Sequence, residues 1–482
     1  MAEADRPSGK LSLVPLTAMV VGSMVGAGIY NLPGRFAGAT GPFGALIAWG
    51  IAGTGMYMLA RVFQALAEKR PDIDSGVFAY AKAGFGDYPG FLSAFGYWLG
   101  SCLGNVFYWV LIGSTLGRFF PEVFGDGSSP AAIILALVGI WSFHFLILRG
   151  VEQATLINMV VTGAKLIPIL LAIAVFVIAF NFQQFSENFF GGADLAGKSL
   201  IDQVRDTMLI TVFVFLGIEG ASVYSRHARK RADVGSATIL GFVAVTGLMV
   251  AVTLLPYAVA PRADIAAAAN PSLGGALELV VGHWGAVFIA VGVLVSVLGA
   301  YLAWSLICAE VLFAAARSSD MPKVFAKQNS NGVPANALWL TNIVVSLFVL
   351  STYWSSDAFN IMLDMTSVTT LLPYLLVAGY GVLVARRPPG VGIATGGRGP
   401  ACRDLIIAAV AVIYTLFMFL AAGLQYVLLV AVLYAPGTLL YLWARRERGA
   451  RYFNRAEILV FAVVLIAAAA GIWSLLSGAI TL

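Results

Sequence analysis

Two apolar stretches of this chain, in matching positions of its two halves, are interrupted by glycine. The first reads VVGSMVGAGIY (residues 20–30), and the second reads FVFLGIEGAS (residues 213–222). Glycine weakens a helix, and inside a bilayer backbone N–H and C=O groups leave the helical ladder only where they face protein or a water-filled cavity. The paired interruptions therefore predict a binding site near the middle of a membrane, the plan of a secondary transporter.

The composition of the whole chain agrees with a membrane protein. Of its 482 residues, 60% are hydrophobic and only 11% are charged, whereas soluble domains contain about 25% charged residues. A spanning helix needs roughly 20 apolar residues, and the sequence contains about thirteen such segments, with twelve possible. We predict an all-α polytopic membrane protein. Its short connections leave no room for a soluble catalytic or output domain, which argues against an enzyme or a receptor.

The interruptions also predict the internal organisation. A unit of five spans starts on one face of a membrane and ends on the other, so a second unit of five enters with opposite topology. Because spans one and six carry the breaks, we predict a five-plus-five inverted-repeat fold with broken helices 1 and 6. The predicted units are a cytoplasmic tail (1–12), a transport core (13–385), a cytoplasmic linker (386–403) and peripheral spans (404–482). Two of the peripheral spans are expected at 404–423 and 426–444.

The distribution of basic residues predicts the orientation of the chain in the membrane. It does not indicate a polyanionic partner. Most of the 29 lysines and arginines crowd into alternate connections, as in the run 226–231 and the linker after 385. This asymmetry is typical of the cytoplasmic side of multi-pass proteins. We therefore expect a cytoplasmic N-terminus and no nucleic acid partner. The start of the chain lacks the pattern of a cleaved signal peptide.

Exposed backbone groups at the two breaks suit an α-amino acid. At the first break, Gly26, Ala27 and Gly28 can present N–H groups to a carboxylate at the start of a half-helix. At the second break, Leu216, Gly217 and Ile218 can present carbonyl oxygens to an ammonium group. The alternative is that Gly22 and Gly26 only allow close helix packing.

Four motifs, together with the breaks, carry a family resemblance. They read GSMVGAGIYNLP (22–33), AYAKAGFG (79–86), FLGIEGAS (215–222) and SDMP (319–322). These stretches resemble the amino acid–polyamine–organocation transporters over about residues 10–385. Within that superfamily the chain is most similar to basic amino acid antiporters, and among these to the arginine/ornithine exchangers, which share thirteen predicted spans and the GYW…GN pattern at 96–105.

The resemblance implies roles for individual residues. It places the substrate carboxylate at Gly26–Gly28, where relatives often have serine in place of Ala27. Ser101 and Asn105 match pocket residues of the relatives. Phe213 matches an aromatic gate, and Trp304 matches an aromatic residue that stacks on bound arginine. The alternative for Trp304 is a lipid-facing anchor. Weaker pocket candidates are Tyr97, Tyr108, Thr366, Ser367 and Thr369.

Three ionisable residues fall inside predicted spans, where such groups are costly and usually functional. Glu219 directly follows the second break and could respond to the substrate's charge, or could bond backbone freed by the break. Glu310 lies six residues beyond Trp304, toward an inner gate. Lys165 resembles the lysine that replaces bound sodium in some relatives, which implies that no sodium is needed.

The predicted function is exchange of external arginine for internal ornithine by alternating access. Alternatives with the same fold are arginine/agmatine, lysine/cadaverine or histidine/histamine exchange, or proton-coupled uptake. No cofactor and no metal site are expected, because His144, His227 and His283 are isolated and the three cysteines form no CxxC pair. The expected partners are small amino acids and lipid, with the protein a monomer or a homodimer.

Overall fold

The computed structural model describes residues 13–70, 72–73, 77–150, 154–192, 195, 197–218, 231–355, 357–386 and 401–480. Within these ranges every regular element is a helix. The first half contains α1 (Leu13–Met24), η1 (Ala27–Asn31), α2 (Leu32–Ala39), α3 (Pro42–Lys69), α4 (Val77–Phe85), α5 (Asp87–Gly117), α6 (Pro121–Phe124), α7 (Pro130–Leu148) and α8 (Ala154–Ile178).

The second half repeats the pattern of long helices joined by short ones. It begins with α9 (Phe182–Asn188), α10 (Leu200–Arg205), α11 (Met208–Phe215), α13 (Arg231–Leu254), η4 (Leu255–Ala258), α14 (Arg262–Ala266) and α15 (Ser272–Val281). It continues with α16 (His283–Arg317), η5 (Lys323–Ala326), α17 (Ala335–Ser351), η6 (Thr352–Trp354), α18 (Ala358–Ala385), α19 (Ala401–Arg446) and α20 (Arg455–Leu476).

Among the described residues, nine helices are long and apolar enough to cross a membrane, or ten if the bent pair α8–α9 counts as one span. The predicted all-α multi-pass fold is confirmed, while the number thirteen stays a prediction. The helix α19 contains non-helical backbone at Gly423 (φ 80°, ψ 159°). This position coincides with the end of the span expected at 404–423.

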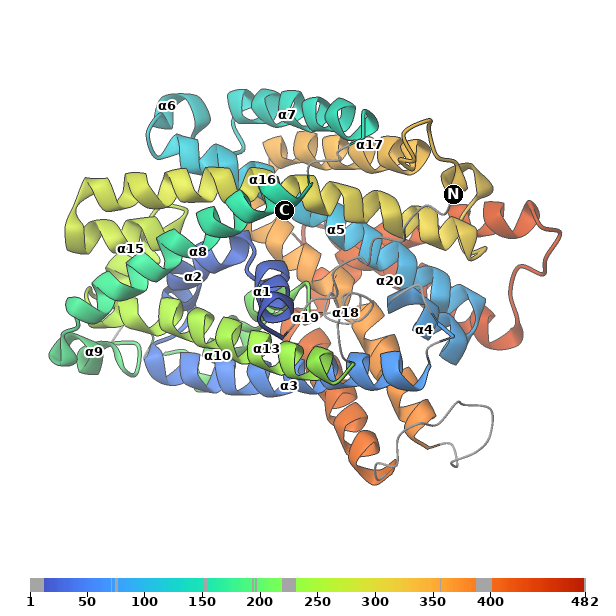
Figure 1. Ribbon diagram of the computed structural model, residues 1–482, viewed down its shortest axis with the longest axis horizontal. Coiled ribbons are helices and arrows are strands. Elements are labelled where there is room, and N and C mark those ends of the chain that lie inside the picture. The colour runs from blue at the N-terminus through green and yellow to red at the C-terminus, as the bar shows by residue number, and fades with distance from the viewer. Residues whose placement is uncertain are drawn as a thin grey trace, which may run out of the picture.

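The helix α5 is the central element of the bundle, and almost all of it is buried. It packs against α4, α16, α17 and α18, and Figure 1 shows it running through the middle of the molecule beneath α7 and α17. A helix that is apolar on all sides is stable only where other helices surround it. The site described below therefore has a buried helix as one of its walls.

Figure 1 shows short helices at both ends of the long bundle. We call the end that carries α2, α9, α14 and α15 the α2 end, and the end that carries α4 the α4 end. Under the predicted orientation the α4 end faces the cytoplasm.

The helices α19 and α20 are bonded to the core at the α4 end. Glu457, near the start of α20, is buried, and its Oε1 accepts a hydrogen bond from the backbone N–H of Tyr88 in the first turn of α5 (3.0 Å). Its Oε2 accepts from the backbone N–H of Asn454 (2.8 Å), which completes a capping box. Arg445 of α19 pairs with Asp87 of α5 (2.8 Å). One carboxylate thus caps α20 and bonds the start of α5.

An ion pair between a partly exposed lysine and a buried aspartate lies at the α4 end. Lys82 of α4 donates to Asp320 Oδ1 (2.6 Å) and to the carbonyl oxygen of Ser318 (3.0 Å), and it lies 3.4 Å from Asp87. Burial raises the pKa of Asp320 to about 6, because the loss of hydration outweighs the opposing charges of Lys82 and Arg448.

The raised pKa of Asp320 predicts a pH-dependent stability. A carboxyl whose pKa is higher in the folded state than its unfolded value of 3.8 stabilises the fold when protonated. This contribution to the unfolding free energy is fully present below the unfolded pKa and is lost as the pH rises through about 6. We expect the unfolding free energy in detergent to fall by on the order of 3 kcal/mol over this interval, and Asp320→Asn to remove that part of the dependence.

The control for this experiment is Asp72→Asn, which changes an exposed carboxyl whose pKa the neighbouring Arg70 lowers. This variant should keep the slope of the unaltered protein across the same pH interval. An Asp320→Asn protein with an unchanged slope would show that Asp320 stays ionised throughout.

Candidate functional site

The first predicted interruption is present. The last helical bond of α1 runs from the N–H of Val25 to the carbonyl of Val21 (2.9 Å). Gly26 is then extended (φ −101°, ψ −169°), and the chain resumes as the short helix η1. The backbone therefore leaves the helical ladder at Val25 and Gly26 and re-enters it with a new N-terminus at Ala27.

The second predicted interruption is also present. The helix α11 ends at Phe215, Leu216 has ψ 138°, and Gly217 has φ 99°, a conformation that residues with a Cβ rarely adopt. Ile218 closes the turn by donating to the carbonyl of Phe215 (3.2 Å). Glu219 lies outside the described residues.

The two breaks meet in space at Gly28. A Cβ built on Gly28 would lie 2.6 Å from Cδ1 of Phe213 and 2.9 Å from Cγ1 of Val214. Glycine is therefore needed for η1 to approach α11 this closely. The contact joins segments that are 185 residues apart in the sequence.

A cavity opens beside this contact. Its walls come from α1, η1, α5, α11, α16 and α18, and they consist of Met24, Gly26, Gly28, Tyr97, Gly100, Ser101, Gly104, Tyr108, Phe213, Val214, Leu216, Trp304, Thr366 and Thr370. Nine of the residues singled out from the sequence, contributed by five separate segments, line it together: Gly26, Gly28, Tyr97, Ser101, Tyr108, Phe213, Leu216, Trp304 and Thr366.

Four other candidates lie behind the lining. Ala27 and Ile218 are buried beside it, and Gly217 forms the turn. Asn105 is fully buried, and its Nδ2 donates to Sγ of Cys308 on α16 (3.7 Å).

The two described ionisable candidates lie apart from the cavity. Lys165 of α8 is buried, and its carbonyl oxygen accepts from the hydroxyl of Tyr30 (2.9 Å), so it lies next to the first break. Glu310 is exposed on α16. Gating or charge coupling by either residue stays a prediction.

The described lining carries no carboxylate and no ammonium group. It instead presents aromatic rings (Tyr97, Tyr108, Phe213 and Trp304) and hydroxyl groups. The hydroxyls of Ser101 and Thr366 donate to the carbonyls of Tyr97 (2.8 Å) and Met362 (2.7 Å) in their own helices. With their hydrogens used in this way, the hydroxyl oxygens offer only lone pairs to a ligand, and aromatic faces attract cations. The cavity thus suits a cation with N–H donors.

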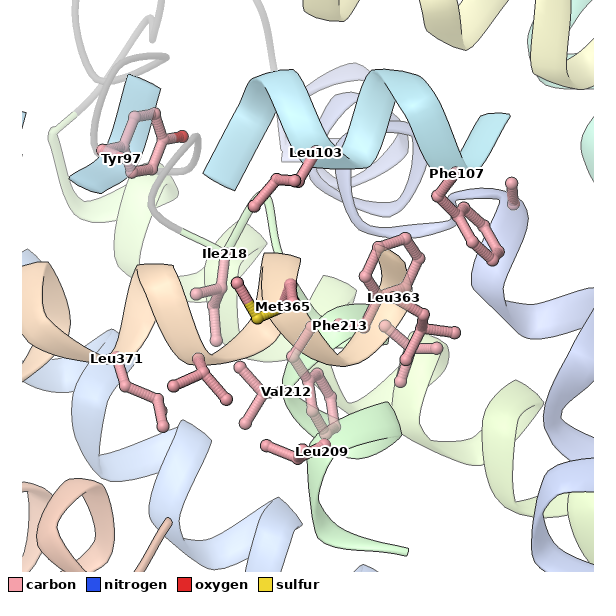
Figure 2. Packing of buried hydrophobic residues seen from close by; sticks show 14 of the residues in the cluster. Tyr97, Leu103, Phe107, Leu209, Val212, Phe213, Ile218, Leu363, Met365 and Leu371 are labelled. Carbon is pink, nitrogen blue, oxygen red and sulfur yellow. The ribbon is translucent and has the colours of Figure 1, made fainter. Parts of the chain in front are cut away.

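An aromatic layer covers the cavity toward the α2 end. The ring of Phe213 packs edge-on against Phe107 of α5 (centroids 4.8 Å apart), and Phe107 packs against Phe359 of α18 (4.9 Å). Figure 2 shows Phe107 on α5, Phe213 on α11 and Leu363 on α18 within one apolar cluster.

A buried ion pair holds the same end together. Nη2 of Arg35 on α2 lies 2.7 Å and 2.6 Å from the two carboxylate oxygens of Asp364 on α18. The hydroxyl of Tyr426 on α19 donates to Asp364 Oδ2 (3.1 Å). Because α2 continues directly from η1, this bond fixes the segment that follows the first break. Nothing in the sequence pattern indicates this ion pair.

A bundle of long apolar helices, with two broken segments meeting at a cavity, defines a multi-pass membrane transporter. The model of the amino acid permease family matches residues 11–437, and the chain belongs to that family.

The chain is similar over its full length to curated relatives. It is 47% identical to an arginine/ornithine antiporter of Pseudomonas aeruginosa, over 99% of this chain and 100% of the relative. It is 39% identical to an L-lysine transport protein of Corynebacterium glutamicum (99% and 98%). It is 36% identical to an arginine/agmatine antiporter of Chlamydia trachomatis (96% of each).

Proposed function

We propose that the protein is a secondary-active antiporter of the bacterial inner membrane that exchanges external arginine for internal ornithine. The observation that carries this proposal is the cavity between the two breaks, whose aromatic and hydroxyl lining suits a cationic amino acid. The relative with 47% identity carries the same substrate pair in its name.

Each part of the substrate has a proposed partner. The backbone N–H groups at Gly26–Gly28 bind the carboxylate, and the carbonyl oxygens near Leu216–Ile218 bind the α-ammonium group. Trp304 and Phe213 pack on the aliphatic stem, and a cation over such a ring is worth about 0.5–2 kcal/mol. Ser101 and Asn105 serve the distal group.

The exchange needs no further energy source. Arginine and ornithine each carry one positive charge at neutral pH, so a one-for-one exchange moves no net charge. Lys165, buried next to the first break, supplies a positive charge at the place where some relatives bind sodium.

Counterflow in proteoliposomes tests this proposal. Vesicles loaded with ornithine should take up labelled arginine, and empty vesicles should not. An imposed membrane potential should leave the initial rate unchanged, because the exchange is electroneutral. Arginine uptake into agmatine-loaded vesicles but not into ornithine-loaded vesicles would replace the proposed pair with arginine/agmatine. Net arginine uptake driven by the membrane potential would refute exchange.

A further inference from the structure

A cleft lies between α3, α18 and α19, on elements that are separate from the break segments, and we call it the α3–α19 cleft. The three helices meet closely at Gly381 of α18, where an added Cβ would lie 2.8 Å from Cγ1 of Val62 and 3.3 Å from Cβ of Ala408. All three residues line the cleft, so their contact forms its floor. The apolar side chains of Val384 and Ile407 form part of its walls.

The cleft lies on a face of α3 that is open to the surroundings. Thr54, Arg61 and Glu68 are seven residues apart, and residues at this spacing differ by only about 20° in direction around a helix axis. Thr54 and Glu68 are exposed, and Arg61 is partly exposed. In a bilayer this face of α3 contacts lipid. A ligand can therefore enter the cleft sideways from the membrane.

Two charged side chains in the cleft have no ion-pair partner among the described residues. Lys69 at the end of α3 pairs with Asp404 of α19, whereas Arg61 and Glu68 form no ion pair within the described part of the chain. Between them on α3, the buried Oε1 of Gln64 has no hydrogen bond there, while Nε2 of the same amide donates to Glu68 Oε1 (3.1 Å). The cleft thus offers a cation, a neutral acceptor and an anion in that order along α3.

These three groups define the chemistry of a matching ligand. A guanidinium group only donates hydrogen bonds, so Arg61 requires an anion such as phosphate. Gln64 Oε1 and the Glu68 carboxylate only accept, so they require a cation that carries N–H groups. The two basic and the two acidic residues of the described lining cancel in charge. A zwitterionic ligand therefore fits the cleft better than an anionic one.

The position of Arg61 along α3 agrees with a lipid phosphate. Arg61 lies eight residues before Lys69, the last residue of α3, which is about 12 Å along the helix axis. The headgroup layer of a bilayer is about 5–8 Å thick on each side, so Arg61 begins near the border of the hydrocarbon. In a phospholipid the phosphate follows the acyl chains and the amine follows the phosphate, which is the same order as Arg61 and Glu68 along α3.

We propose that the α3–α19 cleft binds a phospholipid with an ethanolamine headgroup. The phosphate bonds Arg61, the ammonium group donates to Gln64 Oε1 and to Glu68, and an acyl chain packs on Val384 and Ile407. A choline headgroup has no N–H group to donate, and a glycerol headgroup has no cation. The site is independent of the transport cavity and adds a lipid ligand to the proposed function.

Lipid binding to the purified full-length protein tests the proposal. Protein freed of native lipid in detergent is titrated with phosphatidylethanolamine, phosphatidylcholine or phosphatidylglycerol of identical acyl chains, and bound lipid is counted by native mass spectrometry. The variants are Arg61→Gln and Glu68→Gln. The matched control is Arg149→Gln, which changes an exposed arginine at the end of α7. Figure 1 shows α7 and α3 on opposite sides of the bundle.

We expect the unaltered protein to bind phosphatidylethanolamine about tenfold more tightly than either other lipid. Arg61→Gln should remove most of this preference, and Arg149→Gln should keep it. Because the Glu68 carboxylate repels an anionic headgroup, Glu68→Gln should weaken phosphatidylethanolamine binding and strengthen phosphatidylglycerol binding. Glu68 is exposed, so its replacement leaves the fold intact and keeps the test valid if Arg61→Gln fails to fold.

Equal affinities of the unaltered protein for the three lipids, or a preference for phosphatidylglycerol, would overturn the proposal. Equal losses in Arg149→Gln and Arg61→Gln would also overturn it, because the effect would then come from the overall charge. Glycerophosphoethanolamine, the headgroup without acyl chains, should not bind at the same concentrations. Binding as tight as that of the intact lipid would identify a site for a soluble phosphate ester instead.

Discussion

Replacing Gly28 with alanine should weaken substrate binding while the protein still inserts and folds. The added methyl group would lie 2.6 Å from the Phe213 ring and 2.9 Å from Val214. Phe213 cannot simply rotate away, because Phe107 packs against it with ring centroids 4.8 Å apart. Overpacking of this kind costs about 1–3 kcal/mol, which corresponds to roughly 5- to 150-fold in affinity. Arginine binding to the purified variant measures the effect.

Gly38→Ala is the matched control for this prediction. Gly38 lies on α2, ten residues further along the same segment, and a Cβ built there meets nothing within 4 Å. The control should bind arginine like the unaltered protein. A second variant, Gly28→Ala with Phe213→Leu, should recover part of the thermal stability, because the shorter side chain leaves room for the methyl group. Normal arginine binding and stability in Gly28→Ala would show that η1 and α11 do not meet as described.

Breaking the pair between Arg35 and Asp364 should give the largest loss of stability. Arg35→Gln leaves a carboxylate that is 4% exposed and whose remaining hydrogen bond among the described residues comes from the Tyr426 hydroxyl. Removing one member of a buried pair costs about 3–5 kcal/mol, because the remaining charge stays buried. Thermal unfolding in detergent measures this loss. The expected fall in the unfolding temperature should be partly reversed by the double variant Arg35→Met with Asp364→Leu, which removes both charges.

The control for the ion pair is Arg205→Gln. Arg205 lies 3.6 Å from Asp202 on the surface, and both side chains are about half exposed. Exposed pairs are worth about 0–1 kcal/mol, so this variant should unfold at nearly the normal temperature. Equal losses in Arg35→Gln and Arg205→Gln would contradict the burial of the first pair. Because α2 follows the first break, the Arg35 variant should also change the balance between open and closed states at the α2 end. The accessibility of a cysteine introduced at that end would measure this change.

The sequence predicts the breaks well, because glycine weakens the helix at its own position and the apolar segments around it are long. It also predicts most of the cavity lining, since the segments that carry Gly26, Ser101, Phe213 and Trp304 resemble family motifs. Asn105 shows the limit of spacing arguments. Two residues four apart on a helix differ by about 40° in direction around the helix axis, whereas two residues seven apart differ by about 20°. Tyr108, seven after Ser101, therefore lines the cavity, while Asn105 points toward α16.

The missed features depend on contacts between distant segments. No local pattern pairs Arg35 with Asp364, which is 329 residues away. Thr370 and Gly104 line the cavity and could have been found, because each lies three or four residues from a candidate on the same helix.

The bond between Glu457 and the start of α5 has a consequence for biosynthesis. The ribosome completes α5 long before it makes α20, so the N–H of Tyr88 must wait for its partner until Glu457 has been translated. Asp87 lies 3.4 Å from Lys82, which precedes it in the chain, but must wait for Arg445. Insertion of the central helix is therefore finished only when the last helices reach the membrane. Nascent chains released before residue 445 should be targets for membrane quality-control proteases, even though they already contain every residue of the cavity.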